Sequence, residues 1–103
     1  MGKLLVFSKP VSAEREDEYN RWYDDVHLAD VCSLESVTGA RRFKVSDTQM
    51  SVMGAPDYEY VAIYDFTGPP DAVLDGLSAG GTSWEISPAL DTASARLVVV
   101  DEY

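Results

Sequence analysis

The sequence predicts one α+β domain, in which four antiparallel strands form a single sheet and two helices cover one face of it. Its 103 residues suffice for one domain and are too few for two, so the domain spans residues 1–103. Strand-like and helical patterns follow one another as strand, helix, strand, strand, helix, strand. Large apolar residues occupy both faces of the strands, although two helices can cover only one face.

The chain begins with a short apolar strand over 3–7, which Pro10 ends. A helical pattern follows from Ser12, a candidate N-cap, to about Leu34. The acidic residues after Ser12 favour a helix start because they lie at the positive end of its dipole. Apolar and aromatic side chains recur every three or four residues and predict one shared face, made of Tyr19, Trp22, Tyr23, Val26 and Asp30.

After Gly39, which marks the expected exit from the helix, four more elements complete the chain. They are a strand over 40–46, a strand over 58–66 beyond a polar loop at 47–57, a short helix over 71–77, and a last strand over 93–100 beyond an irregular stretch at 82–91. The resulting βαββαβ order is that of the ferredoxin-like arrangement.

The strand patterns also predict a homodimer. Leu97 and Val99 face one way while Val98 faces the other, and the third strand carries apolar residues opposite its tyrosine row. The face without helices would therefore expose large apolar side chains to water. A second copy of the chain, related by a two-fold axis, is the commonest way to cover such a face.

Composition excludes several classes of partner. Eighteen acids against eight bases give a net charge of −10, which repels nucleic acids and anionic membrane surfaces. The first apolar run is far shorter than a signal-peptide core, and no stretch approaches the roughly 20 residues of a membrane span. The single cysteine, Cys32, predicts a cytoplasmic protein and is expected to be buried packing. One histidine and one cysteine predict no metal site.

Two sequence runs bear a family resemblance. The runs YNRWYDDVHL at 19–28 and VTGARRF at 37–43 resemble the dimeric α+β barrel superfamily, and within it the EthD-like group. Ala29 and Thr38 stand where that group often has proline. The resemblance implies a ferredoxin-like dimeric barrel with a small organic ligand between helices and sheet. It leaves the activity open among cofactor-independent cyclases, dehydratases, isomerases, monooxygenases and haem-degrading proteins.

His27, Asp30 and Tyr23 are the candidate catalytic residues. His27 is the only histidine, four residues after Tyr23 and three before Asp30, so all three side chains can meet on one stretch of helix. A histidine beside a carboxylate suits acid/base chemistry near neutral pH. Two alternatives stay open: Asp30 could instead cap a following short turn, and His27 could be a structural residue at the helix end.

Five further residues are expected to bind the substrate. Tyrosine hydroxyls can donate hydrogen bonds to a developing enolate, and a tryptophan outside the regular elements could close a pocket. Packing in the core or at an interface is the alternative role. The five residues are Trp22, Tyr60, Tyr64, Trp84 and Arg42, the last of which could bind an acidic group.

Together these residues predict an enzyme that needs no cofactor and acts by acid/base chemistry on a small aromatic or polyketide-like carbonyl compound. Cyclisation, dehydration and isomerisation all fit such a site. The alternatives are a non-catalytic ligand-binding or structural dimer module, and a cofactor-free monooxygenase.

Overall fold

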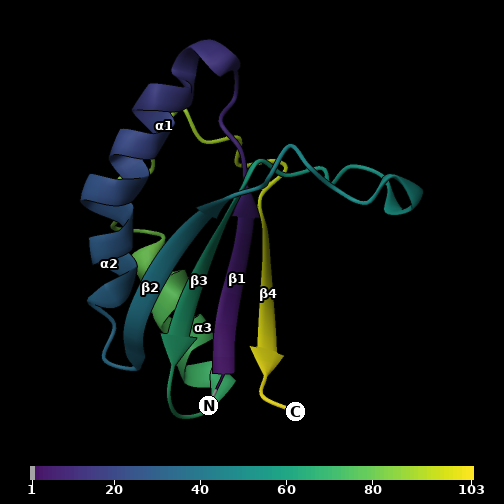
Figure 1. Ribbon diagram of the computed structural model, residues 1–103. Coiled ribbons are helices and arrows are strands. Elements are labelled where there is room, and N and C mark those ends of the chain that lie inside the picture. Colours follow the sequence, from purple (N-terminus) through teal and green to yellow (C-terminus); the bar gives the residue numbers. More distant parts are fainter. Residues whose placement is uncertain (1) are drawn as a thin grey trace.

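The computed structural model describes residues 2–103 and confirms the predicted ferredoxin-like α+β fold. Four antiparallel strands form one sheet in the order β2-β3-β1-β4. The helices all lie on one side of this sheet (Figure 1). The strands are β1 (Gly2–Ser8), β2 (Val37–Lys44), β3 (Tyr60–Phe66) and β4 (Arg96–Asp101).

A long, irregular helical segment joins β1 to β2. It comprises a 3-10 turn (Ala13–Arg15), α1 (Glu16–Trp22), a π-helix (Tyr23–His27) and α2 (Leu28–Cys32). Ser12 precedes the first turn in extended backbone, but its side chain caps no backbone N–H group. A π-helix has i→i+5 hydrogen bonds, so this wider turn holds more residues than an α-helical one.

The π-helix changes which residues face the sheet. Tyr19, Trp22 and Tyr23 are buried as expected. Asp30, in contrast, is only partly buried, and Val31 packs into the core in its place. The sequence pattern assumed regular α-helical spacing throughout, whereas the wider turn shifts every later residue by about one position. The prediction that Asp30 shares the aromatic face is therefore wrong.

The core lies between the helices and one face of the sheet. On that face Leu4 of β1 stands opposite Tyr64 of β3 and Val99 of β4. The alternation predicted for β3 is confirmed, since every second side chain from Tyr60 is buried. The largest fully buried apolar side chains are Tyr19, Tyr23, Tyr64, Phe66, Leu4, Val31 and Val73.

No helix covers the opposite face of the sheet, which we call the open face. The register of the four strands places large apolar side chains there. Phe43 is 44% exposed and Val98 is 43% exposed, far above the values of the core. The large apolar residues of the open face are Leu5, Phe7, Phe43, Val61, Ile63, Val98 and Val100.

Element boundaries differ from the sequence pattern at several points. β2 begins before Gly39 and passes it with a bulge, so Gly39 lies within the strand rather than at the helix exit. The second long helix, α3 (Pro70–Gly80), is longer than the predicted 71–77. This helix begins with a proline at its first position. Proline is suited to this position, because the backbone N–H that it lacks would have no partner within the helix.

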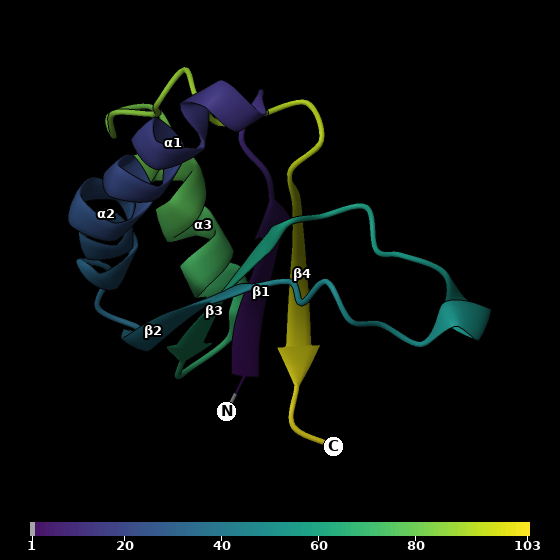
Figure 2. The same ribbon diagram turned by 45° about the horizontal axis from the view of Figure 1, so that its top comes forward.

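Between β2 and β3 the chain projects away from the domain. Residues 47–57, which we call the arm, extend away from the helices past β4 (Figures 1 and 2), and all of them are exposed. A backbone hydrogen bond of 2.8 Å from Val45 to Glu59 closes the base of the arm. A 3-10 turn, Ser51–Met53, forms its tip, and Gly54 follows with φ +75°, a conformation that suits glycine.

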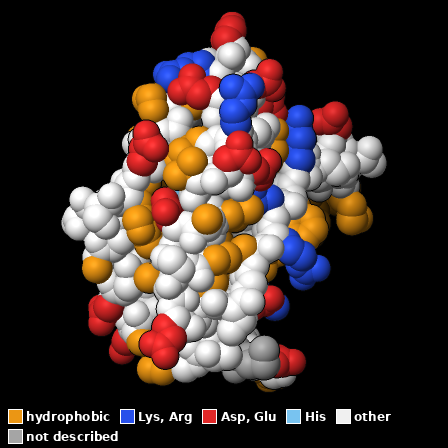
Figure 3. Space-filling model, turned by 90° about the vertical axis from the view of Figure 1, so that its left-hand side faces the viewer, with side chains coloured by type: hydrophobic (Ala, Val, Ile, Leu, Met, Phe, Trp, Pro, Cys, Tyr) orange, Lys and Arg blue, Asp and Glu red, His pale blue; other side chains and the backbone are white. Residues whose placement is uncertain are grey.

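The chain is acidic, with a net charge of −10. Figure 3 shows Asp and Glu side chains scattered over the face that it presents. Cys32 lies exposed at the end of α2, so the expectation that it is buried packing is wrong. Within residues 2–103, no helix has the length and apolar character needed to cross a membrane.

Candidate functional site

His27 lies inside a cage of aromatic rings. Its imidazole stacks on Trp22 at a centroid distance of 4.6 Å and meets the edges of Tyr23 at 5.1 Å and Trp84 at 6.2 Å. Three of these four side chains come from the junction of α1 with the π-helix, which turns Tyr23 and His27 toward the same space. π-helical turns often occur at functional sites. The local backbone therefore singles out the same segment as the sequence pattern.

The loop after α3 supplies the fourth ring. Trp84 packs directly over Gly80, where a Cβ atom would lie only 2.4 Å from the indole. Nearby, the Trp22 indole N–H donates a 2.8 Å hydrogen bond to the Glu85 carbonyl. These contacts fix the 82–91 stretch, which has no regular secondary structure, against both helical segments.

Four buried polar atoms beside this cage have no hydrogen-bond partner among the described residues. They are the hydroxyls of Tyr23 and Tyr64, Nδ1 of His27 and Nε of Arg42. The Arg42 guanidinium lies 4.3 Å from the centre of the Tyr23 ring, which in turn contacts His27. The side chains of Arg42, Tyr23 and His27 thus contact one another in turn, and the Tyr64 hydroxyl lies close to that of Tyr23. Buried polar atoms without partners are rare in folded proteins and call for an explanation.

Burial sets the protonation of this group. It raises the pKa of Tyr23 to about 12 and raises the pKa of Tyr64 further. Burial also lowers the pKa of His27, and the negative charge of Asp30 opposes that shift only in part. At neutral pH the phenols are therefore hydrogen-bond donors, and the imidazole is neutral and able to accept a proton.

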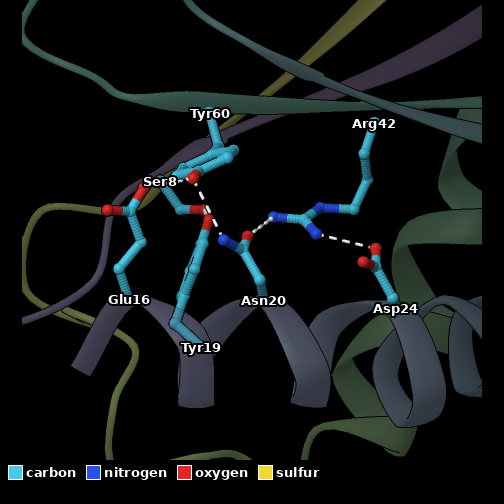
Figure 4. A network of polar contacts seen from close by, with 7 residues as sticks. All are labelled: Ser8, Glu16, Tyr19, Asn20, Asp24, Arg42 and Tyr60. Carbon is cyan, nitrogen blue, oxygen red and sulfur yellow. Dashed lines mark hydrogen bonds and ion pairs between the residues drawn. The ribbon is translucent and has the colours of Figure 1, made fainter.

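A hydrogen-bonded network borders the cage on the β2 side (Figure 4). Arg42 donates to Asp24 at 2.7 Å and to Asn20 at 2.8 Å. Asn20 donates to the Tyr60 hydroxyl at 3.0 Å, and that hydroxyl donates to Glu16. This last hydrogen bond lowers the pKa of Glu16. The network anchors Arg42 to successive turns of the helical segment.

A pocket of about 360 Å³ opens beside this network. Arg42 lines this pocket, and the guanidinium of Arg42 also covers the Tyr23 ring. The lining residues are Asn20, Asp24, Arg42, Phe43, Lys44 and Tyr60. His27 does not line this pocket.

The sequence-predicted residues fall into two neighbouring groups. Trp22, Tyr23, His27 and Trp84 form the aromatic cage, with the Tyr64 hydroxyl close to that of Tyr23. Arg42 and Tyr60 line the pocket.

Asp30 does not cap a new turn, and its catalytic role beside His27 stays a prediction. It makes no hydrogen bond with His27, and the helix continues through it, so it caps no new turn. Its influence on His27 is a charge effect through space.

Sequence reasoning missed the residues that hold Arg42. Glu16, Asn20 and Asp24 each contribute to the network of Figure 4. Their spacing of four residues was a usable signal, because it places all three side chains along one side of a helix. The aromatic residues at 19, 22 and 23 gave the stronger pattern, so the polar row of Glu16, Asn20 and Asp24 was overlooked.

Known structures share this fold. No family model matches the chain, and no curated protein matches it. An EthD family protein from Bacillus halodurans C-125 superimposes with a TM-score of 0.66 at 12% identity, covering 100% of this chain and 99% of that one. A dimeric ferredoxin-like protein of unknown function from Jannaschia sp. CCS1 gives 0.60 at 17% identity, with 98% of each chain covered.

A third similar structure contains a bound tetrapyrrole. It is a mutant of MhuD with two manganese protoporphyrin IX molecules per active site, at a TM-score of 0.70, 8% identity, and coverage of 99% of this chain and 94% of that one. At these identities the likeness shows the fold alone. It agrees with the resemblance found in the sequence, because an EthD family protein and a dimeric ferredoxin-like protein are both among the neighbours.

Proposed function

We propose that this protein is a homodimer that binds a small aromatic carbonyl compound between its long helical segment and the sheet, and that His27 performs acid/base chemistry on it. The observation that carries this proposal is the connected group of unpartnered buried atoms at Tyr23, Tyr64, His27 and Arg42. A carbonyl or phenolate oxygen accepts hydrogen bonds and would complement the tyrosine and arginine donors. The surrounding aromatic rings suit an aromatic compound.

The proposed homodimer accounts for the open face of the sheet. Phe43, Val98 and Val100 are between 36% and 44% exposed there, and a second copy would remove them from water. The dimeric neighbour from Jannaschia supports this assembly by likeness of fold. A cytoplasmic location stays a prediction, supported by the single cysteine of the chain.

Access to the buried group would run through the pocket beside Arg42. Entry by this route requires the Arg42 side chain, which is 11% exposed, to leave Asp24 and Asn20 and move off the Tyr23 ring. A ligand entering there would meet the hydroxyls of Tyr23 and Tyr64 first and His27 beyond them.

Enolisation is the proposed chemical step, and cyclisation, dehydration and isomerisation can all use it. A neutral His27 nitrogen takes the proton from the carbon next to the carbonyl. The electrons of that C–H bond form a C=C bond, and negative charge moves to the carbonyl oxygen. The hydroxyls of Tyr23 and Tyr64 donate hydrogen bonds to this oxygen, which favours the enolate. The proton then returns from His27 to the product.

Binding can be tested with 1,8-dihydroxyanthraquinone, an aromatic carbonyl probe whose binding quenches tryptophan fluorescence. We expect Tyr23→Phe combined with Tyr64→Phe to weaken binding about 30-fold, since each of the two lost hydrogen bonds is worth about 1 kcal/mol. Tyr58→Phe is the matched control, because Tyr58 packs against Phe7 on the open face. If wild type, the double variant and Tyr58→Phe bind the probe with equal affinity, the ligand does not bind at the hydroxyls of Tyr23 and Tyr64.

Catalysis can be tested by the exchange of the α-protons of 2-tetralone in D₂O, followed by NMR. We expect His27→Ala to slow exchange by about 10²-fold or more while the anthraquinone probe still binds. The wild-type rate should persist at pH 6.5, where an ordinary histidine is half protonated, because the pKa of His27 is lowered. If wild type exchanges the α-protons of 2-tetralone no faster than His27→Ala does, the result would favour a binding module without catalytic activity.

A further inference from the structure

The tip of the arm carries large apolar side chains that are mostly exposed to solvent. Met50, Val52 and Met53 are 68%, 86% and 82% exposed. These are among the most exposed large apolar side chains of the described chain, and they lie together around one 3-10 turn. Single exposed apolar residues are common, but a cluster at the end of a projecting segment marks an interaction surface.

Charge separates the arm from the rest of the protein. The chain has a net charge of −10, yet residues 48–56 contain no charged side chain. Acidic residues border this neutral stretch at Asp47 and Asp57. A neutral apolar tip can approach a strongly acidic surface without repulsion, whereas most of the remaining surface of this protein repels its own copies.

The arm is continuous with the open face. At its base, Tyr58 packs on Phe7 of the open face at a ring-centre distance of 5.5 Å, and Phe43 lies exposed at the end of β2. From this base the arm runs away from the helices, as Figure 2 shows. A second copy seated on the open face would therefore lie beside the arm.

The proposed dimer would gain area from contacts outside the open face. Standard interfaces use about 20–30 residues and about 800 Å² per partner, and seven large apolar side chains lie on the open face. Lys3 and Asp65 also interrupt that face with an ion pair. Contacts from two arms, one from each copy, would enlarge the buried area.

We propose that the arm of each chain docks through Met50, Val52 and Met53 on the second copy of this chain, so that two arms clamp the dimer. The inference rests on the proposed homodimer and adds to it a second area of contact outside the sheet.

Methionine labelling offers a direct test, because only three methionines occur in the chain and two are in the arm. Protein with ¹³C-methyl methionine in a deuterated background is mixed with unlabelled protein and allowed to exchange subunits. Met50→Leu and Met53→Leu assign the two signals. We expect filtered NOEs from these methyl groups to protons of the unlabelled copy. A dimer without such NOEs would overturn the arm contact.

Sedimentation equilibrium supplies the second measurement. We expect the combined variant Met50→Ser, Val52→Ser, Met53→Ser to raise the dimer dissociation constant about tenfold or more, with an unchanged circular dichroism spectrum. Thr48→Ala combined with Gln49→Ser, on the same arm, is the control. An unchanged constant in the Ser variant would refute the arm contact but leave the dimer in place.

A second control separates the arm contact from the dimer itself. Phe43→Asp places a charge on the open face and should abolish dimerisation if the two sheets face each other. A wild-type protein that stays monomeric at every concentration would overturn both the homodimer and the arm contact.

Discussion

The protonation of His27 is opposed by its burial among Trp22, Tyr23 and Trp84, which lowers its pKa from about 6.5. The unfolded chain therefore binds this proton more readily than the folded one. The contribution of neutral, buried His27 to the free energy of unfolding is fully present above pH 6.5. It declines as the pH falls from 6.5 through the lower pKa that His27 has in the folded protein. We expect urea unfolding of wild type to show this decline and His27→Gln to show a flatter profile.

The comparison is clean because the chain has no other histidine. Glu16 and Glu18, whose pKa values are lowered by hydrogen bonds, lose their contributions only at more acidic pH. Parallel profiles for the two proteins between pH 7 and 5 would mean that His27 is freely solvated.

Two buried tyrosines should respond oppositely to loss of their hydroxyl groups. Tyr64→Phe removes a buried hydroxyl without a partner and should leave the free energy of unfolding unchanged or raise it by up to about 1 kcal/mol. Tyr19→Phe breaks a 2.5 Å hydrogen bond with buried Ser8 and should cost about 1–2 kcal/mol. Urea titrations measure both. A clear loss on Tyr64→Phe would indicate an ordered water or ligand at that hydroxyl.

At the scale of elements, the end of α3 requires a residue without a side chain, because the Trp84 ring occupies the space beside Gly80. Alanine in place of glycine normally stabilises a helix by about 1 kcal/mol. At Gly80, however, the new Cβ would lie 2.4–2.6 Å from the Trp84 ring. We expect Gly80→Ala to destabilise the protein by about 1–3 kcal/mol and to change its tryptophan fluorescence, since Trp84 must move.

Exposed Ser78 in the same helix provides the control, and Ser78→Ala should be neutral or slightly stabilising. A stabilising effect of Gly80→Ala would show that Trp84 is not held against the helix.

Regular patterns made most elements predictable. The alternation in β3 specified which side chains face the core, because a strand has a side-chain period of two. The helical pattern after Ser12 was equally clear up to Tyr23. Beyond Tyr23 the π-helix interrupts the α-helical spacing of the side chains, and no nearby residue type indicates this interruption. For this reason Asp30 was expected on the face where Val31 packs into the core instead.

The candidate site was predictable only in part, because its pieces meet across layers. The helical motif placed Tyr23 and His27 together, four residues apart. In contrast, the contact of Arg42 with Asp24 joins a strand to a helix 18 residues away, and Trp84 reaches His27 from a loop after α3. Such contacts between residues far apart in the sequence depend on how the helices pack on the sheet. The spacing of neighbouring residues in the sequence does not predict this packing.

At the scale of the whole molecule, charge and apolar contact act against each other in the proposed dimer. Two chains of net charge −10 repel, and salt screens this repulsion. We expect the dimer to tighten as NaCl rises from about 0.05 to 0.5 M, because the Debye length falls from above 10 Å to below 5 Å. Sedimentation velocity across this series measures the change. Weaker association at high salt would mean that ion pairs, rather than apolar contacts, hold the copies together.

The π-helix also means that the long helical segment is one residue longer than a regular helix between the same end points. Deleting Asp25, an exposed residue of that turn, should let an α-helical turn close while Tyr19 and Val31 keep their places in the core. Only the direction of the side chains between Tyr23 and His27 would change. We expect the shortened chain to unfold at a urea concentration close to that of wild type but to lose tetralone exchange. Chain length at this one turn would then tune activity without altering the fold.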